Sequence, residues 1–293
     1  MEKELQILAL ADYYEQFSVN GCSAYLIINK KMNDHQCLFG FTQLSENFDD
    51  AKAMFSEIEK RAKELGYKEL VGPVNYCSWM SYRWAISNYE TRLFPDCTNP
   101  PFYVDYIRQL GYRELYTYRS ARIDINNPLY AVGEQLLKQK IDEGFTFEFY
   151  KGESAYALAQ DVFSISQEAF AGSYLYCDIP KEYFEKLYLS WTKNIELIMY
   201  VAFYKGEPVG YVMGYDSPYG DCFISKTSAV KPEFQKHKIY TALLYLGCKY
   251  VIDMGYKDMM YHFQCEQKDS FRRFEKNIES NEKRYAVFIK ELI

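Results

Sequence analysis

Residues 250–264, YVIDMGYKDMMYHFQ, repeat the pattern of residues 62–75, AKELGYKELVGPVN. In each stretch a helical pattern ends at a glycine, Tyr-Lys and an acidic residue follow, and a short apolar run comes next. A glycine directly after a helical pattern is typical of a helix C-terminus, because the backbone there turns through the left-handed region. Each stretch therefore predicts a crossover helix that leads into a strand, and Gly66 and Gly255 mark the same joint at an offset of 189 residues.

The similarity extends outward from this joint. At the same offset, the amphipathic helix predicted at 49–65 falls on 238–254, and the strand predicted at 38–44 falls on 227–233. A strand–turn–helix–strand unit that recurs without a gap favours two related units, although coincidence between two generic αβ units remains the alternative. Hairpin signals such as Lys205-Gly206-Glu207-Pro208 accompany the crossover helices. We therefore expect an α/β (α+β) fold with two units, each a mixed, mostly antiparallel twisted sheet flanked by helices.

The division between the units is expected near residues 124–130, DINNPLY, where Asn-Asn-Pro is a turn signal. A helical pattern at 130–141 follows it. The sequence thus predicts a first domain at 1–123, a connecting helix at 124–144 and a second domain at 145–293.

Composition limits the classes of partner. The formal net charge is -6 and Lys and Arg are not clustered, so nucleic acid is not expected as a partner. The eight cysteines include no C-x-x-C pair and there are only three histidines, so no metal site is predicted. No signal peptide and no apolar run of about 20 residues is present, which indicates a cytoplasmic protein without a membrane span. We expect a monomer or a homodimer.

A loop in the second unit carries the resemblance to a known family. Residues 227–241 read TSAVKPEFQKHKIYT: a strand ends at Val230, a proline follows, and Gln235 opens a loop into a helix. This stretch resembles the GNAT N-acetyltransferase superfamily, whose members place a Q/R-x-x-G-x-G/A loop there to grip the pyrophosphate of acetyl-CoA. Residues 255–278 resemble the downstream motifs of that superfamily. The resemblance covers 145–293 by topology and extends to motifs only at 228–241 and 255–278.

The resemblance implies acetyl-CoA, or another acyl-CoA, as cosubstrate. A helix N-terminus presents unpaired N–H groups and partial positive charge, so it suits a diphosphate. The pantetheine arm is expected between the strands 221–230 and 258–264. The cofactor-binding residues implied are Ser228, Ala229, Val230, Gln235, Lys236, His237, Lys238, Ile239, Tyr240, Thr241 and Gln267.

The second unit also departs from the family pattern. Lys238 stands at the family's glycine, and Tyr240 stands at the last small residue of the loop. Phe274 replaces the tyrosine that often protonates the leaving thiolate, and phenylalanine has no proton to donate. These departures leave open whether the site is catalytically active.

The first unit lacks the phosphate loop. At the same offset it reads Glu46-Asn47-Phe48-Asp49-Asp50-Ala51, and its three carboxylates would repel a diphosphate. Acidic residues complement a helix N-terminus instead. We therefore expect residues 1–123 to form a degenerate GNAT-like domain that is structural or walls a substrate cleft.

Tyr261 and Glu266 are the candidate catalytic residues. Strand alternation places Tyr261 and Phe263 on one face of 258–264 and His262 on the other. Tyr261 is a candidate proton relay or a donor to the thiolate, with an ordinary core tyrosine as the alternative. Glu266 is a candidate base acting through water, with an exposed acid as the alternative. The aromatic loops 75–84 and 173–177 either line a substrate pocket or pack between the domains.

Three functions follow from these patterns. The first is an acetyl-CoA-dependent N-acyltransferase that transfers its acyl group directly to a small-molecule or peptide amine. The second is an inactive module that binds CoA or a partner. The third is a transferase that uses aminoacyl-tRNA, as in peptidoglycan-bridge enzymes built from paired GNAT-like domains, but the helical arm of those enzymes is not seen here. The acidity of the chain suggests a cationic amine as the acceptor.

Overall fold

The computed structural model describes residues 5–32, 34–125, 128–192, 195–219, 222–268 and 278–292 of the 293-residue chain. The strands are β1 (Tyr13–Val19), β2 (Cys22–Ile28), β3 (Gln36–Gln43), β4 (Glu69–Gly72), β5 (Trp84–Ala85), β6 (Arg113–Asp124), β7 (Phe145–Lys151), β8 (Ile198–Tyr204), β9 (Glu207–Asp216), β10 (Phe223–Val230), β11 (Asp258–Cys265) and β12 (Ile278–Glu291). The helices are η1 (Gln6–Leu10), α2 (Phe48–Glu64), α3 (Pro101–Gln109), α4 (Pro128–Asp142), α5 (Glu153–Tyr156), α6 (Ala159–Phe170), α7 (Lys181–Thr192), η2 (Pro232–His237) and α8 (Ile239–Asp253).

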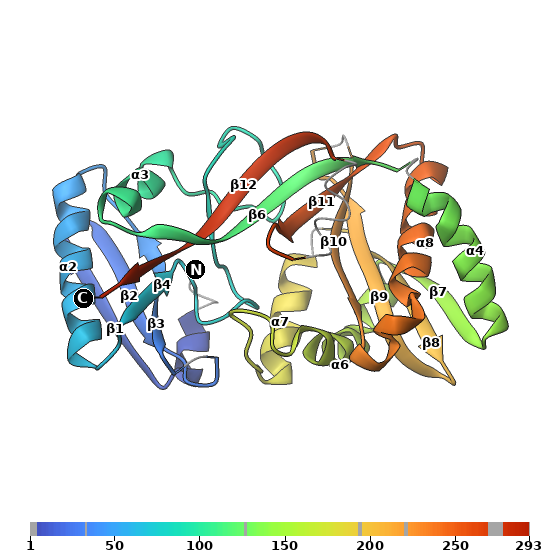
Figure 1. Ribbon diagram of the computed structural model, residues 1–293, viewed down its shortest axis with the longest axis horizontal. Coiled ribbons are helices and arrows are strands. Elements are labelled where there is room, and N and C mark those ends of the chain that lie inside the picture. Colours follow the sequence, from blue (N-terminus) through green and yellow to red (C-terminus); the bar gives the residue numbers. More distant parts are fainter. Residues whose placement is uncertain are drawn as a thin grey trace.

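The described strands form one continuous mixed sheet. Its order is β1-β2-β3-β4-β12-β6-β11-β10-β9-β8-β7, with β5 paired to β12 outside this path. Figure 1 shows the sheet twisting along the length of the molecule, with α2 and α3 at one end and α4 and α8 at the other. This confirms the predicted α/β fold with a twisted mixed sheet flanked by helices. No helix within the described ranges is long and apolar enough to cross a bilayer.

The repeated joint is present in both halves. The helix α2 connects the parallel strands β3 and β4, and α8 connects the parallel strands β10 and β11. Gly66 and Gly255 have φ of +87° and +85°. After each glycine, the tyrosine N–H donates to the carbonyl oxygen five residues back, at 3.0 Å for Tyr67 and 3.1 Å for Tyr256. Both helices thus end in the same glycine-terminated cap, as the repeat predicts.

The turn before the helix differs between the halves. Four residues separate the end of β3 at Gln43 from the start of α2, whereas β10 ends at Val230 and the additional helix η2 precedes α8. The predicted end of the strand at Val230 is confirmed, whereas the offset that maps 38–44 onto 227–233 does not hold beyond Val230. Pro232 begins η2, since proline lacks an N–H and suits the first turn of a helix.

The start of α2 fits its acidic sequence. The Asn47 side chain caps the helix by accepting from the Asp49 N–H at 3.1 Å, and Asp49 and Asp50 occupy the first turn. Acidic residues thus complement the helix N-terminus as predicted, while the cap itself is the amide of Asn47. The apolar face predicted for this helix is also buried: Ala51, Met54, Phe55, Ile58 and Ala62.

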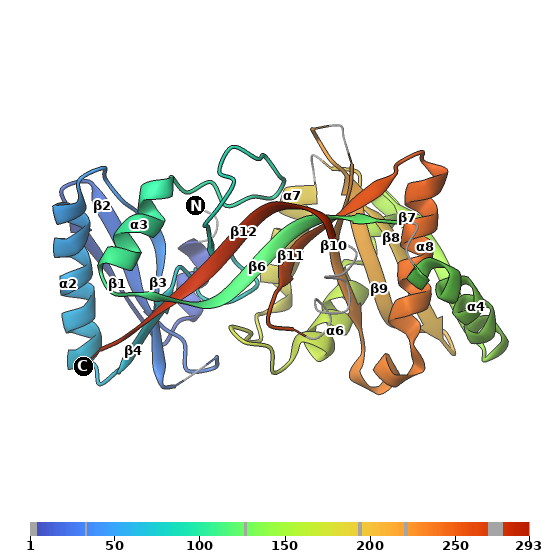
Figure 2. The same ribbon diagram turned by 45° about the horizontal axis from the view of Figure 1, so that its top comes forward.

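The closing strands are exchanged between the halves. The strand β6 follows the first unit but pairs with β11 of the second, and β12 follows the second unit but pairs with β4 of the first. The two closing strands also pair with each other along most of their length. Figure 2 shows β6 and β12 running side by side from one half to the other. The predicted segments 1–123 and 145–293 therefore share these strands, a sharing that the sequence did not reveal.

Helices cover both faces of the second half. Along β9, Tyr211 and Met213 belong to the core under α6, and Val212 belongs to the core under α8. The core that includes α6 and α7 continues into the first half through Val71, Tyr76 and other buried residues. One hydrophobic core thus joins the two halves on this face.

Candidate functional site

The strands β10 and β11 separate partway along their length. Their parallel ladder joins Phe223–Ser225 to Met259–Tyr261. Beyond it, β10 has a register shift around residue 226 and β11 has one around residues 262–263. Bulges of this kind bend a strand and redirect its side chains. Residues 226–230 of β10 therefore border an opening in the sheet that leads toward the start of α8.

A cavity of about 620 Å³ lies at this opening. Its walls come from both halves of the chain: the loop 78–83 and β6 from the first, and α6, α7, β9, β10 and β11 from the second. The aromatic loops 75–84 and 173–177 both contribute, through residues such as Trp79 and Tyr174. Trp79 also donates a hydrogen bond to the Cys177 carbonyl oxygen at 3.0 Å. These loops therefore both line the cavity and pack between the halves.

The predicted cofactor residues divide into two groups by position. Five of them line the cavity: Ser228, Ala229, Val230, Gln235 and Tyr240. The Gln235 side chain donates to the Val230 carbonyl oxygen at 3.2 Å and so ties the end of β10 to η2. The other members of the loop are placed next to them at the start of α8: Lys236, His237, Lys238, Ile239 and Thr241.

Lys238 adopts the backbone conformation that a glycine would favour. Its φ is +59° and ψ is +24°, and it both ends η2 and precedes the first turn of α8. Lys236, His237 and Lys238 are exposed, whereas Ile239 is buried. The turn thus presents positive side chains and the first N–H groups of a 15-residue helix at the same place.

Gln267 lies apart from this loop. Its side-chain oxygen accepts from the Thr117 N–H at 3.2 Å, and its Nε2 donates to the Thr117 hydroxyl at 2.9 Å. Both ends of the amide therefore bind β6. The structure does not bring Gln267 together with the residues of the η2–α8 turn, and these contacts favour a role in joining β11 to β6.

Tyr261 is connected to the cavity through Tyr240. Tyr261 is 6% exposed, packs in the core under α8 and is hydrogen-bonded to the Tyr240 side chain. Tyr240 lines the cavity and is also hydrogen-bonded to the Ser228 side chain. Burial raises the pKa of Tyr240 to about 12, so its hydroxyl keeps its proton at neutral pH. Tyr240, rather than Tyr261, is the tyrosine that borders the open space.

Glu266 is held between two arginines. Its carboxylate accepts from Arg119 Nε at 2.7 Å and from Arg284 Nη2 at 2.8 Å. Burial raises the pKa of Glu266, but the hydrogen bonds and charges of its neighbours, above all Arg284, outweigh this and lower it. A carboxylate that holds two arginines and has a lowered pKa is a weak base. Its contacts favour a structural role across β6, β11 and β12.

The predicted alternation along β11 is wrong at residues 261–263. Phe263 has φ of +56°, and His262, Phe263 and Gln264 all line the cavity, whereas Tyr261 faces the opposite core. The bulge around residues 262–263 is the physical reason, since an extra residue shifts every later side chain to the other face.

His262 is buried and neutral. Its Nε2 lies 2.7 Å from the Pro95 carbonyl oxygen and therefore carries the proton, so Nδ1 accepts from the Ser120 hydroxyl at 2.8 Å. Burial, together with the charges of Lys226 and Arg83, holds the pKa of His262 well below its ordinary value. Both ring nitrogens are thus engaged, and the ring is fixed in the cavity wall.

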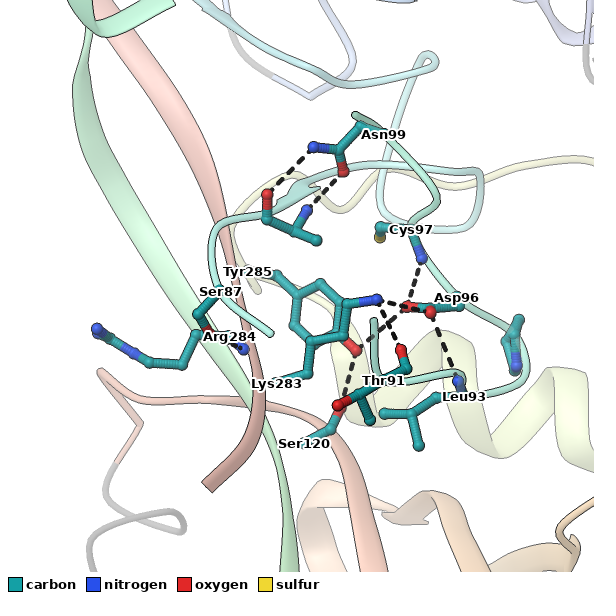
Figure 3. Close-up of polar contacts among 12 residues, drawn as sticks. Ser87, Thr91, Leu93, Asp96, Cys97, Asn99, Ser120, Lys283, Arg284 and Tyr285 are labelled. Carbon is teal, nitrogen blue, oxygen red and sulfur yellow. Dashed lines mark hydrogen bonds and ion pairs between the residues drawn. The ribbon is translucent and has the colours of Figure 1, made fainter. Parts of the chain in front are cut away.

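A buried polar network fixes the loop that contacts His262 (Figure 3). Lys283 is 2% exposed and donates to the Asp96 carboxylate at 2.8 Å and to the Thr91 carbonyl oxygen at 3.1 Å. Tyr285 donates to Asp96 at 3.3 Å and lies 3.4 Å from Ser120 Oγ, the partner of His262. The network thus connects β12 and the loop 91–96 to the wall of the cavity.

Arg83 and Lys226 place positive charge on that wall. The Arg83 Cζ lies 3.8 Å, 4.3 Å and 4.0 Å from the ring centroids of Tyr82, Tyr118 and Phe263. Its Nη1 is buried without a hydrogen-bond partner in the described part of the chain. An unpaired buried donor costs about 1–3 kcal/mol, and such groups often mark a site of function. Burial and the Arg83 charge lower the pKa of Lys226 to about 8.

Sequence patterns did not indicate that Arg83 and Lys226 belong to one site. Arg83 lies in the aromatic loop 75–84, whose rings indicated a substrate pocket or packing between domains, and Lys226 lies in an ordinary strand pattern. Only the folded chain brings them to one cavity. The position of Phe274 lies outside the described residues, so its departure from the family pattern stays a prediction. Within the described ranges, no group of three or more His, Cys, Asp or Glu side chains is placed to hold a metal ion.

Comparison with known proteins identifies the second half. Residues 159–277 match the model of the Acetyltransferase (GNAT) family. No curated protein sequence matches the chain.

Among solved structures, a tandem GNAT protein from the clavulanic acid biosynthesis pathway is similar with a TM-score of 0.51 and 10% identity, over 93% of this chain and 79% of that one. A fungal multi-domain β-N-acetylglucosaminidase that contains a glucosamine N-acetyltransferase region is similar with a TM-score of 0.52 and 10% identity, over 99% of this chain and 34% of that one. At these identities the likeness is one of fold. The chain thus shares the fold of a tandem GNAT protein, and residues 159–277 within it match the acetyltransferase (GNAT) family.

Proposed function

We propose that the protein is an acyl-CoA-dependent N-acyltransferase, with acetyl-CoA as the donor and an amine as the acceptor. The observation that carries the proposal is the opening between β10 and β11, with the η2–α8 turn at one end of it. At the corresponding place in the first unit, Asn47 caps α2 and the acidic residues Asp49 and Asp50 occupy its first turn.

The donor is expected to lie along β10. The N–H groups at the start of α8, with Lys236 and Lys238, would hold its pyrophosphate. The pantetheine arm would then follow residues 227–230 toward the point where the parallel ladder begins. This order brings the thioester near Lys226 and into the cavity that both halves line.

The transfer requires one bond to form and one to break. The nitrogen of an uncharged amine attacks the thioester carbonyl carbon, a C–N bond forms, and the C–S bond breaks with its electron pair on the CoA sulfur. The nitrogen loses a proton and the thiolate gains one. We infer that the Tyr240 hydroxyl supplies the thiolate with its proton and is reprotonated by the proton that the nitrogen loses, because Tyr240 borders the cavity beside Ser228 and is itself protonated at neutral pH. Tyr261 would assist through its hydrogen bond to Tyr240.

An inactive CoA-binding module is the second candidate. Two loop positions favour it: Lys238 replaces the family's glycine and Tyr240 replaces its small residue. The backbone of Lys238 nevertheless takes the left-handed conformation, which keeps the turn in the shape that a glycine would give it. The two candidates differ in whether bound acetyl-CoA is turned over.

Calorimetric titration with acetyl-CoA tests the donor site. We expect the double substitution Lys236→Glu and Lys238→Glu to weaken binding roughly tenfold or more, since it reverses two charges beside the pyrophosphate. The double substitution Lys52→Glu and Lys60→Glu, at two exposed positions of α2, is the matched control, because it makes the same change in net charge, and it should leave the affinity unchanged. Equal effects of both changes, or no binding at millimolar acetyl-CoA, would contradict the proposal. Release of free thiol across a panel of amines then separates the transferase from the inactive module.

A further inference from the structure

Among the described residues that line the cavity, positive side chains are present and carboxylates are not. Of the described residues that line it, Arg83, Lys226 and Lys268 are basic and none is Asp or Glu. Lys268 donates to the Ser173 hydroxyl at 3.4 Å. In the described part of the chain, no carboxylate forms an ion pair with Arg83 or Lys226, and the buried Arg83 Nη1 has no hydrogen-bond partner.

The contacts of Arg83 leave the Nη edge of its guanidinium available to a ligand. Three aromatic rings lie over the guanidinium, and its Nε donates to the Tyr82 carbonyl oxygen at 3.1 Å. Its backbone has φ of +74°, and a residue held in this region is usually fixed there by its surroundings. The planar edge of a guanidinium suits the paired oxygens of a carboxylate or a phosphate.

These cations lie away from the donor's phosphates. Lys226 stands at the start of the opening, and Val230 at its end, next to η2. Four residues of extended strand span about 13 Å. The pyrophosphate of a donor at the η2–α8 turn is therefore too far along β10 to occupy the place beside Lys226. An anionic group bound by Arg83 and Lys226 would therefore belong to the acceptor substrate.

We propose that the acceptor carries an anionic group, a carboxylate or a phosphate, which Arg83 and Lys226 bind while its amine faces the donor. This rests on the proposed function, of which it names the acceptor class. The rest of the cavity is largely aromatic, with Trp79, Phe170 and Tyr188 among its walls, so the acceptor also has an apolar body. A hydrophobic amino acid has all three features. The expectation of a cationic acceptor, drawn from the net charge, is thereby replaced.

Direct binding of matched amines tests this without any donor. The pairs are L-phenylalanine with phenethylamine and L-leucine with isopentylamine for the carboxylate, and phosphoethanolamine with ethanolamine for the phosphate. We expect the anionic member of at least one pair to bind roughly tenfold or more tightly than its partner in a calorimetric titration. The pair that shows this preference indicates whether the anionic group of the acceptor is a carboxylate or a phosphate.

Substitutions then assign the preference to the two cations. Arg83→Met should abolish the difference within the pair, and Lys226→Met should reduce it. Lys226→Met also keeps the test decisive if Arg83→Met does not fold. Arg113→Met, at an exposed site on β6 outside the cavity, is the matched control and should leave the preference intact.

Three results would overturn the proposal. In the first, uncharged or purely cationic amines bind as tightly as the anionic ones. In the second, the preference for the anionic amine survives both cavity substitutions, and in the third, no anionic amine binds up to about 10 mM. Acetyl-CoA binding at the η2–α8 turn is measured separately. The proposal of an anionic acceptor can therefore be wrong while the proposal of an acyl-CoA-dependent transferase holds. A failure of acetyl-CoA binding is detected by a separate measurement.

Discussion

Tyr240 is the residue on which the proposed proton transfer depends. It borders the cavity and is hydrogen-bonded to Ser228 and Tyr261. We expect Tyr240→Phe to lower kcat by about 10²-fold, while the Kd for acetyl-CoA changes little, because only the proton of the hydroxyl is lost. Tyr256→Phe, on a hydroxyl that binds Asp216 outside the cavity, is the control. Steady-state kinetics with an acceptor from the amine panel measure this, and an unchanged kcat would assign the proton to another group.

Lys226 makes stability depend on pH. Its pKa is about 8 in the folded protein, because burial and the charge of Arg83 disfavour its cation, against about 10.5 when unfolded. Between these values the unfolded chain binds more protons, so its free energy of unfolding should rise with pH in this window. The facing groups are Arg83, whose charge helps to lower the pKa of Lys226, and His262, whose own pKa is held well below its ordinary value by burial.

Denaturant unfolding from pH 7 to pH 10 measures this dependence. Relative to Lys226→Met, the wild type should gain on the order of 2 kcal/mol over the range, since each unit of pKa shift corresponds to about 1.4 kcal/mol. A bound anion should raise the pKa of Lys226 and so move the window upward. Parallel curves for the two proteins would show that Lys226 titrates as an ordinary exposed lysine.

At the scale of elements, Glu266 joins the strands that the halves exchange. It follows β11 and binds Arg119 of β6 and Arg284 of β12. Glu266→Gln should lower the free energy of unfolding by about 1–3 kcal/mol, because two partly buried arginines lose their counterion. With its lowered pKa, this stabilisation is present above about pH 4.5 and is lost as pH falls through the folded value.

The same substitution decides between two roles for Glu266. If it is structural, Glu266→Gln reduces stability but leaves kcat within about threefold, measured at a temperature where the variant stays folded. A loss of about 10²-fold or more in kcat, with the fold intact, would restore it as a general base.

Local sequence patterns predicted the helices and their ends well, because these depend on interactions between residues close in sequence. The α2 core face follows from helical spacing, and the caps at Gly66 and Gly255 follow from the need for a positive φ. The resemblance assigned Ser228 and Val230 of β10 to cofactor binding, which stays a prediction, and both residues line the cavity.

Long-range features were not predictable in this way. The bulge at 262–263 reverses a face, yet nothing in the local alternation marks an extra residue. Arg83 meets Lys226 only because the two halves share one core and one sheet. Gln267 and Glu266 bind side chains of β6 that lie far away in the sequence, and no spacing in the sequence indicates these contacts.

The whole molecule is built so that the halves depend on each other. Each closing strand pairs with the other half's strand, and the cavity takes walls from both. The first half lacks a phosphate turn but supplies Arg83 and the aromatic loop. This arrangement gives the first half a role at the site that does not require it to bind CoA.

The most direct test of the acyl-CoA site is a crystal structure of the protein with acetyl-CoA. We expect density for the pyrophosphate at the amides that begin α8, and for the pantetheine arm along residues 227–230 in the opening between β10 and β11. Density for CoA at the acidic turn before α2, or elsewhere with this opening empty, would contradict it.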